Sequence, residues 1–247
     1  MGRTILITGA SRGIGRASAI AAGRLGWSVG VNYAGNRDAA AQVVDAIGAA
    51  GGRAIALKGD VAAEADVLAM FEAMDALGPL DGVVVNAGIV APPLPLAEMS
   101  VDRMRRVFDV NLLGAILVAR EAARRLSRSR GGGGGSIVFV SSIAATLGAP
   151  NEYVDYAAAK GAIDTLTRGL ANELGPDGVR VNAVRPGVID TEIHASGGRP
   201  DRARQVGATA PLGRAGRPEE VAEAILWLLG DGASYTSGAI LDVGGGR

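Results

Sequence analysis

Hydrophobic positions along this chain form short, largely apolar runs that alternate with longer stretches of helical periodicity. A short apolar run indicates a strand, and apolar positions three and four residues apart indicate a helix. The predicted strands are residues 4–7, 28–33, 53–58, 82–85, 136–140, 179–184 and 238–243. The predicted helices are residues 14–25, 38–50, 66–77, 101–110, 112–128, a helix that carries residues 156–160, and residues 218–229. This alternation favours an α/β fold with a doubly wound, mainly parallel seven-stranded sheet and helices on both faces.

The length and composition are compatible with a single domain. The chain has 247 residues, of which 48% are hydrophobic, so it can bury a full core, and the length suits one α/β domain as well as two small ones. Five consecutive glycines, Gly131 to Gly135, are interpreted as a flexible surface connection without chemistry of its own. Because strand–helix alternation resumes directly after them, we expect one domain over residues 1–247.

Charge and cysteine content exclude several classes of function. Lys+Arg and Asp+Glu both number 25, so no overall charge indicates a nucleic-acid or anionic-membrane partner. The chain has no cysteine, which excludes disulfides, thiolate nucleophiles and zinc–thiolate sites, and we predict no metal site. The longest apolar runs, such as Leu112 to Ala119, are far shorter than the roughly 20 residues of a membrane helix. With the first strand leaving no room for a signal peptide, we expect a cytoplasmic protein.

A glycine-rich loop follows the first predicted strand. Thr8 to Gly15 contains the spacing Gly-x-x-x-Gly-x-Gly and leads directly into the first helix. Glycines permit a sharp turn and a close approach of a pyrophosphate, and the helix N-terminus offers unpaired N–H groups to the phosphates. A glycine loop alone is equally compatible with an ordinary turn between strand and helix, so its Rossmann-type assignment depends on residues further along the chain.

The residues after the second strand bear on the choice of cofactor. In dinucleotide folds an acidic residue at this point selects NAD by binding the ribose 2′-hydroxyl. Here the strand ends in Asn32 and Tyr33, with no carboxylate until Asp38. Arg12 and Arg37 are placed to meet a 2′-phosphate, unless both are solvated surface charges. We therefore predict NADP as cofactor, with NAD as the alternative.

Two further strand ends are expected to border the nucleotide. Asp60 and Val61 follow the third strand, where the adenine would lie, although Asp60 is almost as well placed to cap the next helix. The small-residue turn Asn86 to Gly88 follows the fourth strand, at the sheet edge where open α/β sheets bind ligands.

The candidate acid–base chemistry lies on the helix after the fifth strand. Tyr156 and Lys160 are four residues apart and project from one face. A phenol ordinarily has a pKa of about 10, and a neighbouring ammonium favours its ionised form. A lowering by three units exceeds what one partly solvated lysine supplies, so we expect a cationic nicotinamide to contribute. Tyr153 is interpreted as a packing residue, and His194, which has no evident triad partners, as a loop residue.

Together these motifs resemble the classical short-chain dehydrogenase/reductases, including those of 3-oxoacyl-ACP reductase type. The resemblance covers the chain from the glycine loop to its C-terminus. It rests on the Thr-Gly-x-x-x-Gly-x-Gly loop, the Asn-Ala-Gly turn, Asn111 between two helical runs, Ser142 with Tyr156 and Lys160, and the Pro186-Gly187 turn after the sixth strand.

The resemblance implies a set of site residues. Tyr156 would be the general acid/base, Ser142 would bond the substrate oxygen, Lys160 would bind the nicotinamide ribose and tune Tyr156, and Asn111 would hold a water in a proton relay. Ser142 stands fourteen residues before Tyr156, whereas the commoner spacing of thirteen falls on Ile143, so a one-residue insertion is assumed. The implied cofactor-binding residues are Gly9, Ser11, Arg12, Gly13, Ile14, Gly15, Asn32, Tyr33, Asp60, Val61, Asn86, Ala87, Gly88, Tyr156, Lys160, Pro186, Gly187, Val188, Ile189 and Thr191.

The predicted function is hydride transfer between NADP(H) and a small carbonyl or secondary alcohol, in the direction of reduction. Residues from about 190 to 213 would form a substrate lid, with an ungated surface loop as the alternative, and family likeness implies a homotetramer. A non-catalytic redox sensor, which would not need the acid, and an NAD-dependent sugar or alcohol dehydrogenase are the alternatives. An enoyl reductase of the same fold is disfavoured, since that group spaces Tyr and Lys more widely. The sequence does not name the substrate.

Overall fold

A single parallel sheet organises the part of the chain that the computed structural model describes, residues 2–247. Its seven strands within that range lie in the order β3-β2-β1-β4-β5-β6-β7, and every neighbouring pair is parallel. The strands are β1 (Thr4–Ile7), β2 (Ser28–Tyr33), β3 (Arg53–Lys58), β4 (Gly82–Val85), β5 (Gly135–Val140), β6 (Val179–Pro186) and β7 (Ile240–Val243). The predicted doubly wound sheet is confirmed, and it is parallel throughout.

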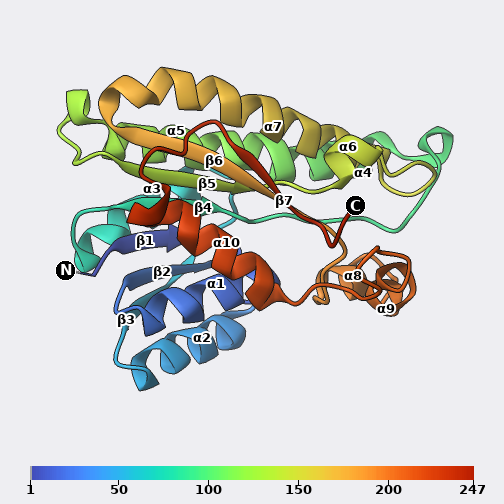
Figure 1. The fold of residues 1–247 in the computed structure, drawn as a ribbon, viewed down its shortest axis with the longest axis horizontal. Coiled ribbons are helices and arrows are strands. Elements are labelled where there is room, and N and C mark those ends of the chain that lie inside the picture. The colour runs from blue at the N-terminus through green and yellow to red at the C-terminus, as the bar shows by residue number, and fades with distance from the viewer. Residues whose placement is uncertain (1) are drawn as a thin grey trace.

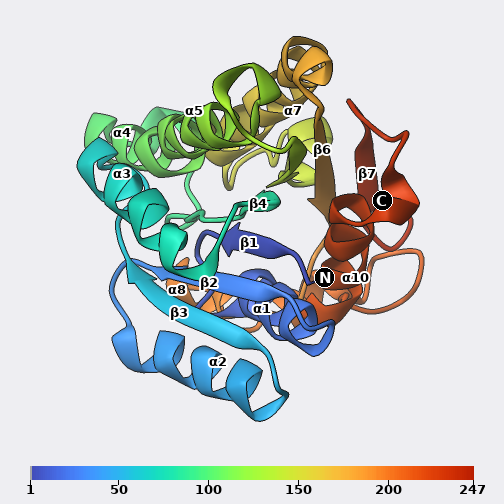
Figure 2. The same ribbon diagram turned by 90° about the vertical axis from the view of Figure 1, so that its left-hand side faces the viewer.

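Helices cover both faces of this sheet (Figure 1). One face carries α1 (Gly13–Arg24), α2 (Arg37–Ala49) and α10 (Pro218–Leu229). The other carries α3 (Glu64–Ala73), α5 (Gly114–Leu126) and α7 (Val154–Leu174), with α4 (Val101–Phe108) leading into α5. Seen from the side, the sheet is twisted between the two helical layers (Figure 2).

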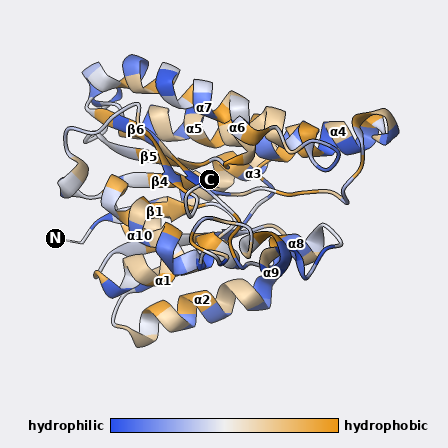
Figure 3. Ribbon diagram, turned by 45° about the vertical axis from the view of Figure 1, so that its right-hand side comes forward, coloured by the Kyte–Doolittle hydropathy of each residue, from blue (hydrophilic) through white to orange (hydrophobic). Residues whose placement is uncertain are grey.

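Alternation along β1 divides its side chains between two hydrophobic cores. Ile5 and Ile7 belong to the core under α1, α2 and α10, whereas Leu6 belongs to the core under α3, α5 and α7. Successive side chains of a strand point to opposite faces, so a run that is apolar at every position is buried on both sides. The helices orient their apolar stripes toward the sheet and their polar residues outward (Figure 3).

The strand order creates a crevice at the carboxyl ends of the strands. β1 lies between β2 and β4. After β1 the chain forms β2 and β3 on one side of it, and then crosses over to form β4 on its other side. Loops that follow β1 and β4 therefore diverge, and open α/β sheets bind ligands at this point of reversal.

Several element boundaries differ from the predicted ones. The two helices predicted around Asn111 are joined by a π-helical turn, Asp109–Leu113, instead of being interrupted there. Short helices that periodicity did not predict occur at α6 (Ala144–Leu147), α8 (Ile193–Ser196) and α9 (Arg202–Gly207). Gly135, the last residue of the glycine run, is the first residue of β5. None of the helices in residues 2–247 has the length and apolar character needed to span a membrane.

Candidate active site

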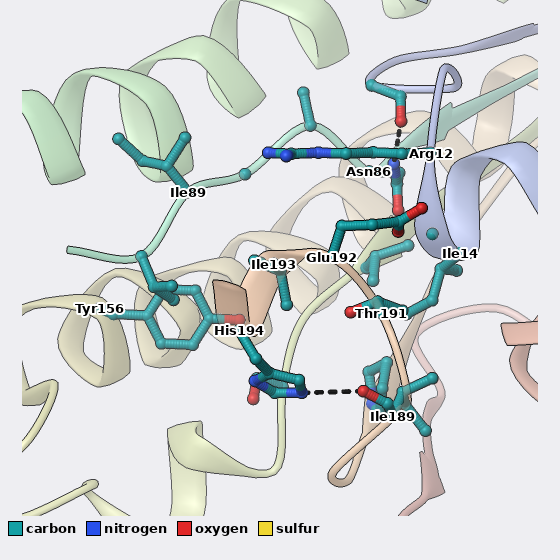
Figure 4. Close-up of a pocket in the computed structure, with 18 of the residues that line it drawn as sticks. Arg12, Ile14, Asn86, Ile89, Tyr156, Ile189, Thr191, Glu192, Ile193 and His194 are labelled. Carbon is teal, nitrogen blue, oxygen red and sulfur yellow. Dashed lines mark hydrogen bonds between the residues drawn. The ribbon is translucent and has the colours of Figure 1, made fainter. Parts of the chain in front are cut away.

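A cavity of about 930 Å³ opens at the carboxyl ends of the strands. Its walls come from the glycine loop, the ends of β2, β4 and β5, the first turns of α7, and the segment after β6 that includes α8 and α9. The close-up in Figure 4 shows side chains from these distant segments converging on it. This volume is in the range of small-molecule and cofactor sites.

The glycine loop is shaped so that helix α1 presents its N-terminus to the cavity. Gly9 has a φ of +63°, and a Cβ on Gly15 would lie 2.5 Å from the Gly9 carbonyl oxygen. No side chain caps the first turn of α1, and no acidic residue lies in it. By contrast, Asn36 caps α2 through a 3.0 Å bond from Ala39 N–H. The uncapped N–H groups of α1 therefore fit an anionic phosphate ligand.

Two asparagines hold this loop from behind. Asn86 Nδ2 donates to the carbonyl of Thr8 at 2.7 Å, and the Thr8 hydroxyl accepts from the Asn86 N–H at 2.9 Å. Asn32 Oδ1 accepts from Gly9 N–H at 2.9 Å, while its Nδ2 donates to the carbonyl of Gly59 at 3.0 Å. Both residues line the cavity, but their amides are engaged in fixing the loop to β2, β3 and β4.

The two arginines expected near the ribose, Arg12 and Arg37, differ in their position relative to the cavity. Arg12 lines the cavity and extends across it (Figure 4), where its Nη1 donates to Ser196 Oγ at 2.9 Å. Arg37 is exposed at the start of α2 and is not part of the cavity wall. Arg16, which the sequence analysis did not select, is part of that wall. Of the two predicted arginines, only Arg12 is thus placed to meet a bound nucleotide.

Asp60 and Val61 both line the cavity. One carboxylate oxygen of Asp60 accepts from Ala62 N–H at 3.0 Å and the other pairs with Arg106 at 3.0 Å. The alternative that Asp60 caps the next helix is wrong, because α3 begins at Glu64, its N-cap residue is Ala63, and no side chain caps it.

Tyr156 and Lys160 lie together on α7, with Lys160 Nζ 5.6 Å from the centroid of the Tyr156 ring. The ammonium donates to the carbonyl of Val140 at 2.7 Å. Burial lowers the pKa of Lys160 to about 8, and the charge of Asp164 acts in the opposite direction. Burial raises the pKa of Tyr156, opposed by a hydrogen bond with Ser142 and by the charge of Arg202. Lys160 alone does not lower the Tyr156 pKa, because desolvation of the phenolate dominates. The expected lowering with the additional help of a bound cationic nicotinamide stays a prediction.

The structure separates the two candidate serines. The Ser141 hydroxyl is buried and donates to Asp164 at 2.7 Å, whereas the Ser142 hydroxyl bonds Tyr156 and accepts from Ala144 N–H at 3.1 Å. Ser142 is therefore the serine at the phenol, fourteen residues before it. The longer connection is accommodated in a turn with positive φ at Gly148 (+74°), Ala149 (+43°) and Asn151 (+61°).

Asn111 lies inside the π-helical turn and is almost fully buried. Its Nδ2 donates to the carbonyls of Val107 and Ile89 at 2.9 and 3.0 Å, and its Oδ1 accepts from Ile89 N–H at 3.1 Å. The amide thus ties the loop after β4 to the start of α5, and π-helical turns are frequent at functional sites. Both N–H groups of the Asn111 side chain are used in these bonds. A water in the predicted relay would therefore have to bind the remaining lone pair of Oδ1 or the backbone of Asn111.

The Pro186–Thr191 segment continues the wall beyond β6. Gly187 N–H donates to the carbonyl of Val243 at 3.0 Å, and Ile143 N–H donates to that of Pro186 at 3.0 Å. A Cβ on Gly13 would lie 3.3 Å from Thr191 Cγ2, so Thr191 stands against the glycine loop. Further predicted nucleotide contacts also line the cavity, namely Ser11, Ile14, Tyr33, Ala87, Gly88, Val188 and Ile189, whereas Gly15 is buried behind the loop and is not part of the wall.

Four residues of the wall were not among the predicted site residues, although two of them, His194 and Arg202, lie in the predicted lid. Glu152 forms ion pairs with Arg199 at 2.5 Å and Arg202 at 2.7 Å, and the Arg202 guanidinium lies 5.2 Å from the centroid of the Tyr153 ring. His194 lies on α8, where its Nε2 is 2.8 Å from the carbonyl oxygen of Ile189. Glu152, Tyr153, His194 and Arg202 all line the cavity. The prediction that His194 lies in a loop is wrong, because it lies in the short helix α8. No local sequence signal identifies this group, because its members meet only through tertiary contacts.

Comparison with known proteins gives consistent results. A family model described as enoyl-(acyl carrier protein) reductase matches residues 9–247. The chain is 50% identical over 243 residues to the uncharacterized oxidoreductase YgfF of Escherichia coli (strain K12), a match that covers 98% of each chain. It is 44% identical over 250 residues to L-rhamnose 1-dehydrogenase (NAD(P)(+)) of Sphingomonas sp. (strain SKA58), covering 99% and 96% of the two chains. A solved short-chain type dehydrogenase/reductase from Mycobacterium marinum superposes with a TM-score of 0.92 at 36% identity, covering 99% and 95%.

Proposed function

The chain belongs to the classical short-chain dehydrogenase/reductase family and is an NAD(P)-dependent, hydride-transferring oxidoreductase, and from this premise we propose that it reduces a small carbonyl compound with NADPH. One observation carries the assignment of the acid–base chemistry. Tyr156 lies at the cavity together with Ser142 and Lys160, and burial raises the pKa of its phenol. A phenol that keeps its proton is suited to protonate the oxygen of a carbonyl that is being reduced.

The cradle at α1 fits the dinucleotide that the family uses. Its uncapped N–H groups would hold the pyrophosphate, and the wall from Asn86 to Gly88 and from Pro186 to Thr191 would border the nicotinamide half. When bound, the nicotinamide supplies hydride at its C4 or accepts it there.

The chain's own residues would manage the proton and the substrate oxygen. Tyr156 would donate its proton to that oxygen, and Ser142 would hold the oxygen through a hydrogen bond. Lys160 would bind the nicotinamide ribose and tune Tyr156, while Asn111 would hold a water that returns a proton from solvent. The buried position of Lys160 and its hydrogen bond to Val140 support a fixed ammonium at this point.

Arg12 and the missing carboxylate after β2 favour NADP(H) over NAD(H). The cavity wall at the end of β2 consists of Asn32, Tyr33, Ala34, Gly35 and Asn36, none of which is acidic. A carboxylate there would repel a 2′-phosphate, whereas an arginine offers it charge-assisted hydrogen bonds. Arg12 would exchange its bond to Ser196 for the phosphate.

A second function, NAD(P)-dependent oxidation of a sugar or alcohol, is supported by one comparison. The relative from Sphingomonas sp. carries the name L-rhamnose 1-dehydrogenase and is 44% identical over nearly the whole chain. An enoyl reductase function is disfavoured, since Tyr156 and Lys160 are only four residues apart. A non-catalytic sensor would not require the Ser142–Tyr156 pair.

Residues 190–213 would act as a lid on a single domain of residues 1–247. The ion pairs of Glu152 with Arg199 and Arg202, and the bond from Arg12 to Ser196, hold this segment over the cavity. Substrate exchange would require these contacts to open.

A homotetramer is the assembly we expect, in a cytoplasmic setting that the lack of cysteine suits. Large apolar side chains are exposed on α5 (Ile116) and around α10 and β7 (Trp227, Tyr235, Leu241). Exposed apolar side chains that cluster on two faces are typical of subunit contacts. Light scattering at micromolar concentration that gave only monomer would contradict this.

The proposed function is tested by a panel of ketones, sugars and secondary alcohols assayed with NADPH, NADH and their oxidised forms. We expect turnover of at least one carbonyl or alcohol, faster with the phosphorylated cofactor. A complete lack of turnover with correctly folded, cofactor-binding protein would overturn it.

A further inference from the structure

His194 holds its imidazole in a defined tautomer at the cavity. Nε2 lies 2.8 Å from the Ile189 carbonyl oxygen. A carbonyl oxygen only accepts hydrogen bonds, so Nε2 carries the proton of the neutral ring and Nδ1 carries a lone pair. The ring is therefore oriented by the chain itself, with an acceptor on its other nitrogen.

The surroundings favour this neutral form. Burial lowers the pKa of His194 and outweighs the hydrogen bond to the Ile189 carbonyl, which acts in the opposite direction, while the smaller effects of the Arg202 and Asp190 charges oppose each other. Nδ1 has no hydrogen-bond donor as a partner among residues 2–247. A neutral acceptor without a partner is thus available at the cavity wall.

The acceptor lies at the substrate end of the cavity. His194 and Tyr156 both line it, and Figure 4 shows both side chains on the side of the cavity away from Arg12 and Ile14 of the glycine loop. Much of the adjoining wall is apolar, including Ile89, Val90 and Val188. An acceptor without a partner beside these apolar residues distinguishes ligands by whether they bring a donor to it.

Helix α8 is held in place by contacts at its C-terminal end. Arg12 donates to Ser196 at 2.9 Å from the glycine loop, and Arg199 N–H donates to the carbonyl of His194 at 2.9 Å. Arg199 is in turn paired with Glu152. Because α8 is tied to both walls, the acceptor is pre-organised relative to Tyr156.

We propose that Nδ1 of His194 accepts a hydrogen bond from a substrate hydroxyl next to the reacting carbon, so that the natural substrate is a hydroxylated carbonyl compound or the corresponding vicinal diol. The inference rests on the proposed function and adds the substrate class to it. An apolar ketone or alcohol would leave Nδ1 buried and unpaired in the closed complex, which disfavours it.

Two probes that differ by one hydroxyl test this directly. The value of kcat/KM for the oxidation of cis-cyclohexane-1,2-diol is compared with the value for cyclohexanol. Both values are measured with NADP⁺ and with NAD⁺. In each oxidation one C–H bond and one O–H bond break and a C=O bond forms, the hydride going to the nicotinamide and the proton to the Tyr156 oxygen, which first releases its own proton to solvent. We expect the wild-type protein to favour the diol by about tenfold, in line with one net hydrogen bond.

Three substitutions separate the two nitrogens of the ring. His194→Phe keeps an aromatic ring but removes the acceptor, so the preference for the diol should disappear through loss of activity on the diol alone. His194→Asn places an amide oxygen near the position of Nδ1 and should retain much of the preference. His194→Gln reaches toward Ile189 instead and should lose it. Equal preferences in the wild-type protein and His194→Phe would overturn the inference.

Binding measurements keep the test independent of turnover. Calorimetry gives the Kd of each probe for the protein saturated with reduced cofactor, which cannot oxidise an alcohol, and the ratio of the two Kd values should follow the same order among the variants. If nothing in the wider panel is turned over, the proposed function fails, while the Kd ratio still decides the role of His194. If turnover occurs but neither ratio responds to His194→Phe, His194 does not select the substrate.

Discussion

Lys160 and Asp164 lie one helical turn apart on α7, and both are almost fully buried. The Asp164 carboxylate accepts from the Ser141 hydroxyl at 2.7 Å and from Arg185 at 2.7 Å. Its negative charge acts against the burial that lowers the pKa of Lys160. Helix α7 thus carries the proposed acid Tyr156 and Lys160, together with the negative charge of Asp164 that partly offsets the burial of Lys160.

The pH dependence of stability should report the buried ammonium. The pKa of Lys160 is about 8 in the folded chain and 10.5 in the unfolded one, so between these values the unfolded chain binds more protons. Stability then rises with pH across this window, and the penalty for burying the charge is fully present below pH 8. Relative to Lys160→Met, the wild-type free energy of unfolding should rise by about 3 kcal/mol from pH 7 to pH 10.5 in denaturant titrations. Lys58→Met, at an exposed position of β3, is the control and should show no such trend.

Removal of the Tyr156 hydroxyl tests the proposed acid. Tyr156→Phe keeps the ring, so the fold and the cofactor affinity should survive while kcat falls by about 10²–10⁴. Tyr153→Phe is the matched control, because the ring that contacts Arg202 is retained. If Tyr153→Phe were inactive and Tyr156→Phe active, the site would be misplaced.

Cofactor preference should depend on Arg12 and not on Arg37. The contact of a guanidinium with a 2′-phosphate contributes about 1.5–3 kcal/mol, so Arg12→Ala should weaken NADP(H) binding by about 10- to 100-fold and leave NAD(H) binding nearly unchanged. Arg37 is outside the cavity wall, and Arg37→Ala should bind both cofactors as the wild type does. Fluorescence titration of NADPH and NADH measures both. A wild-type protein that binds NADH more tightly would contradict the assignment.

A methyl group on Gly15 should disrupt the glycine loop. Its Cβ would lie 2.5 Å from the Gly9 carbonyl oxygen and 2.6 Å from Asn86 Nδ2, so the loop and the fourth strand end would have to separate. We expect Gly15→Ala to reduce cofactor affinity by more than about tenfold and to lower the Tm. Gly48→Ala lies in α2 with no atom within 4 Å of the new Cβ, and it should stabilise the chain by about 0.5–1 kcal/mol. The Tm and the cofactor affinity of both variants are measured by calorimetry. A Gly15→Ala variant as stable and as tightly binding as Gly48→Ala would contradict the predicted clash.

The buried ion pair between Arg103 and Asp155 should dominate the attachment of α7 to α4. The pair is 3.0 Å long with side chains 10% and 2% exposed, and Arg103 also donates to the Glu152 carbonyl. Breaking a buried pair leaves an uncompensated charge, so Arg103→Met should cost about 3–5 kcal/mol in unfolding free energy.

A nearby exposed pair on α4 provides the comparison. Arg105 and Asp102 are 3.8 Å apart and 74% and 95% exposed, so Arg105→Met should change the unfolding free energy by less than about 0.5 kcal/mol. Similar losses in Arg103→Met and Arg105→Met would show that burial does not govern the effect.

Local sequence pattern determined the fold and the centre of the site. Side chains at successive positions of a strand or helix are related by fixed periods, so the apolar runs and stripes predicted the parallel sheet before any tertiary contact was considered. The glycine loop and the Tyr156–Lys160 pair were also readable, because the chemistry of each is contained in one strand end or one helix turn.

Only the tertiary structure decided how distant segments meet around that centre. It engaged the Ser141 hydroxyl with Asp164, a partner that the spacing between Ser142 and Tyr156 did not indicate. It placed His194 and Arg202 at the cavity and Arg37 outside it. It also set the direction of the Tyr156 pKa in the chain by itself, since desolvation depends on every atom packed around the phenol and not on its neighbour four residues away.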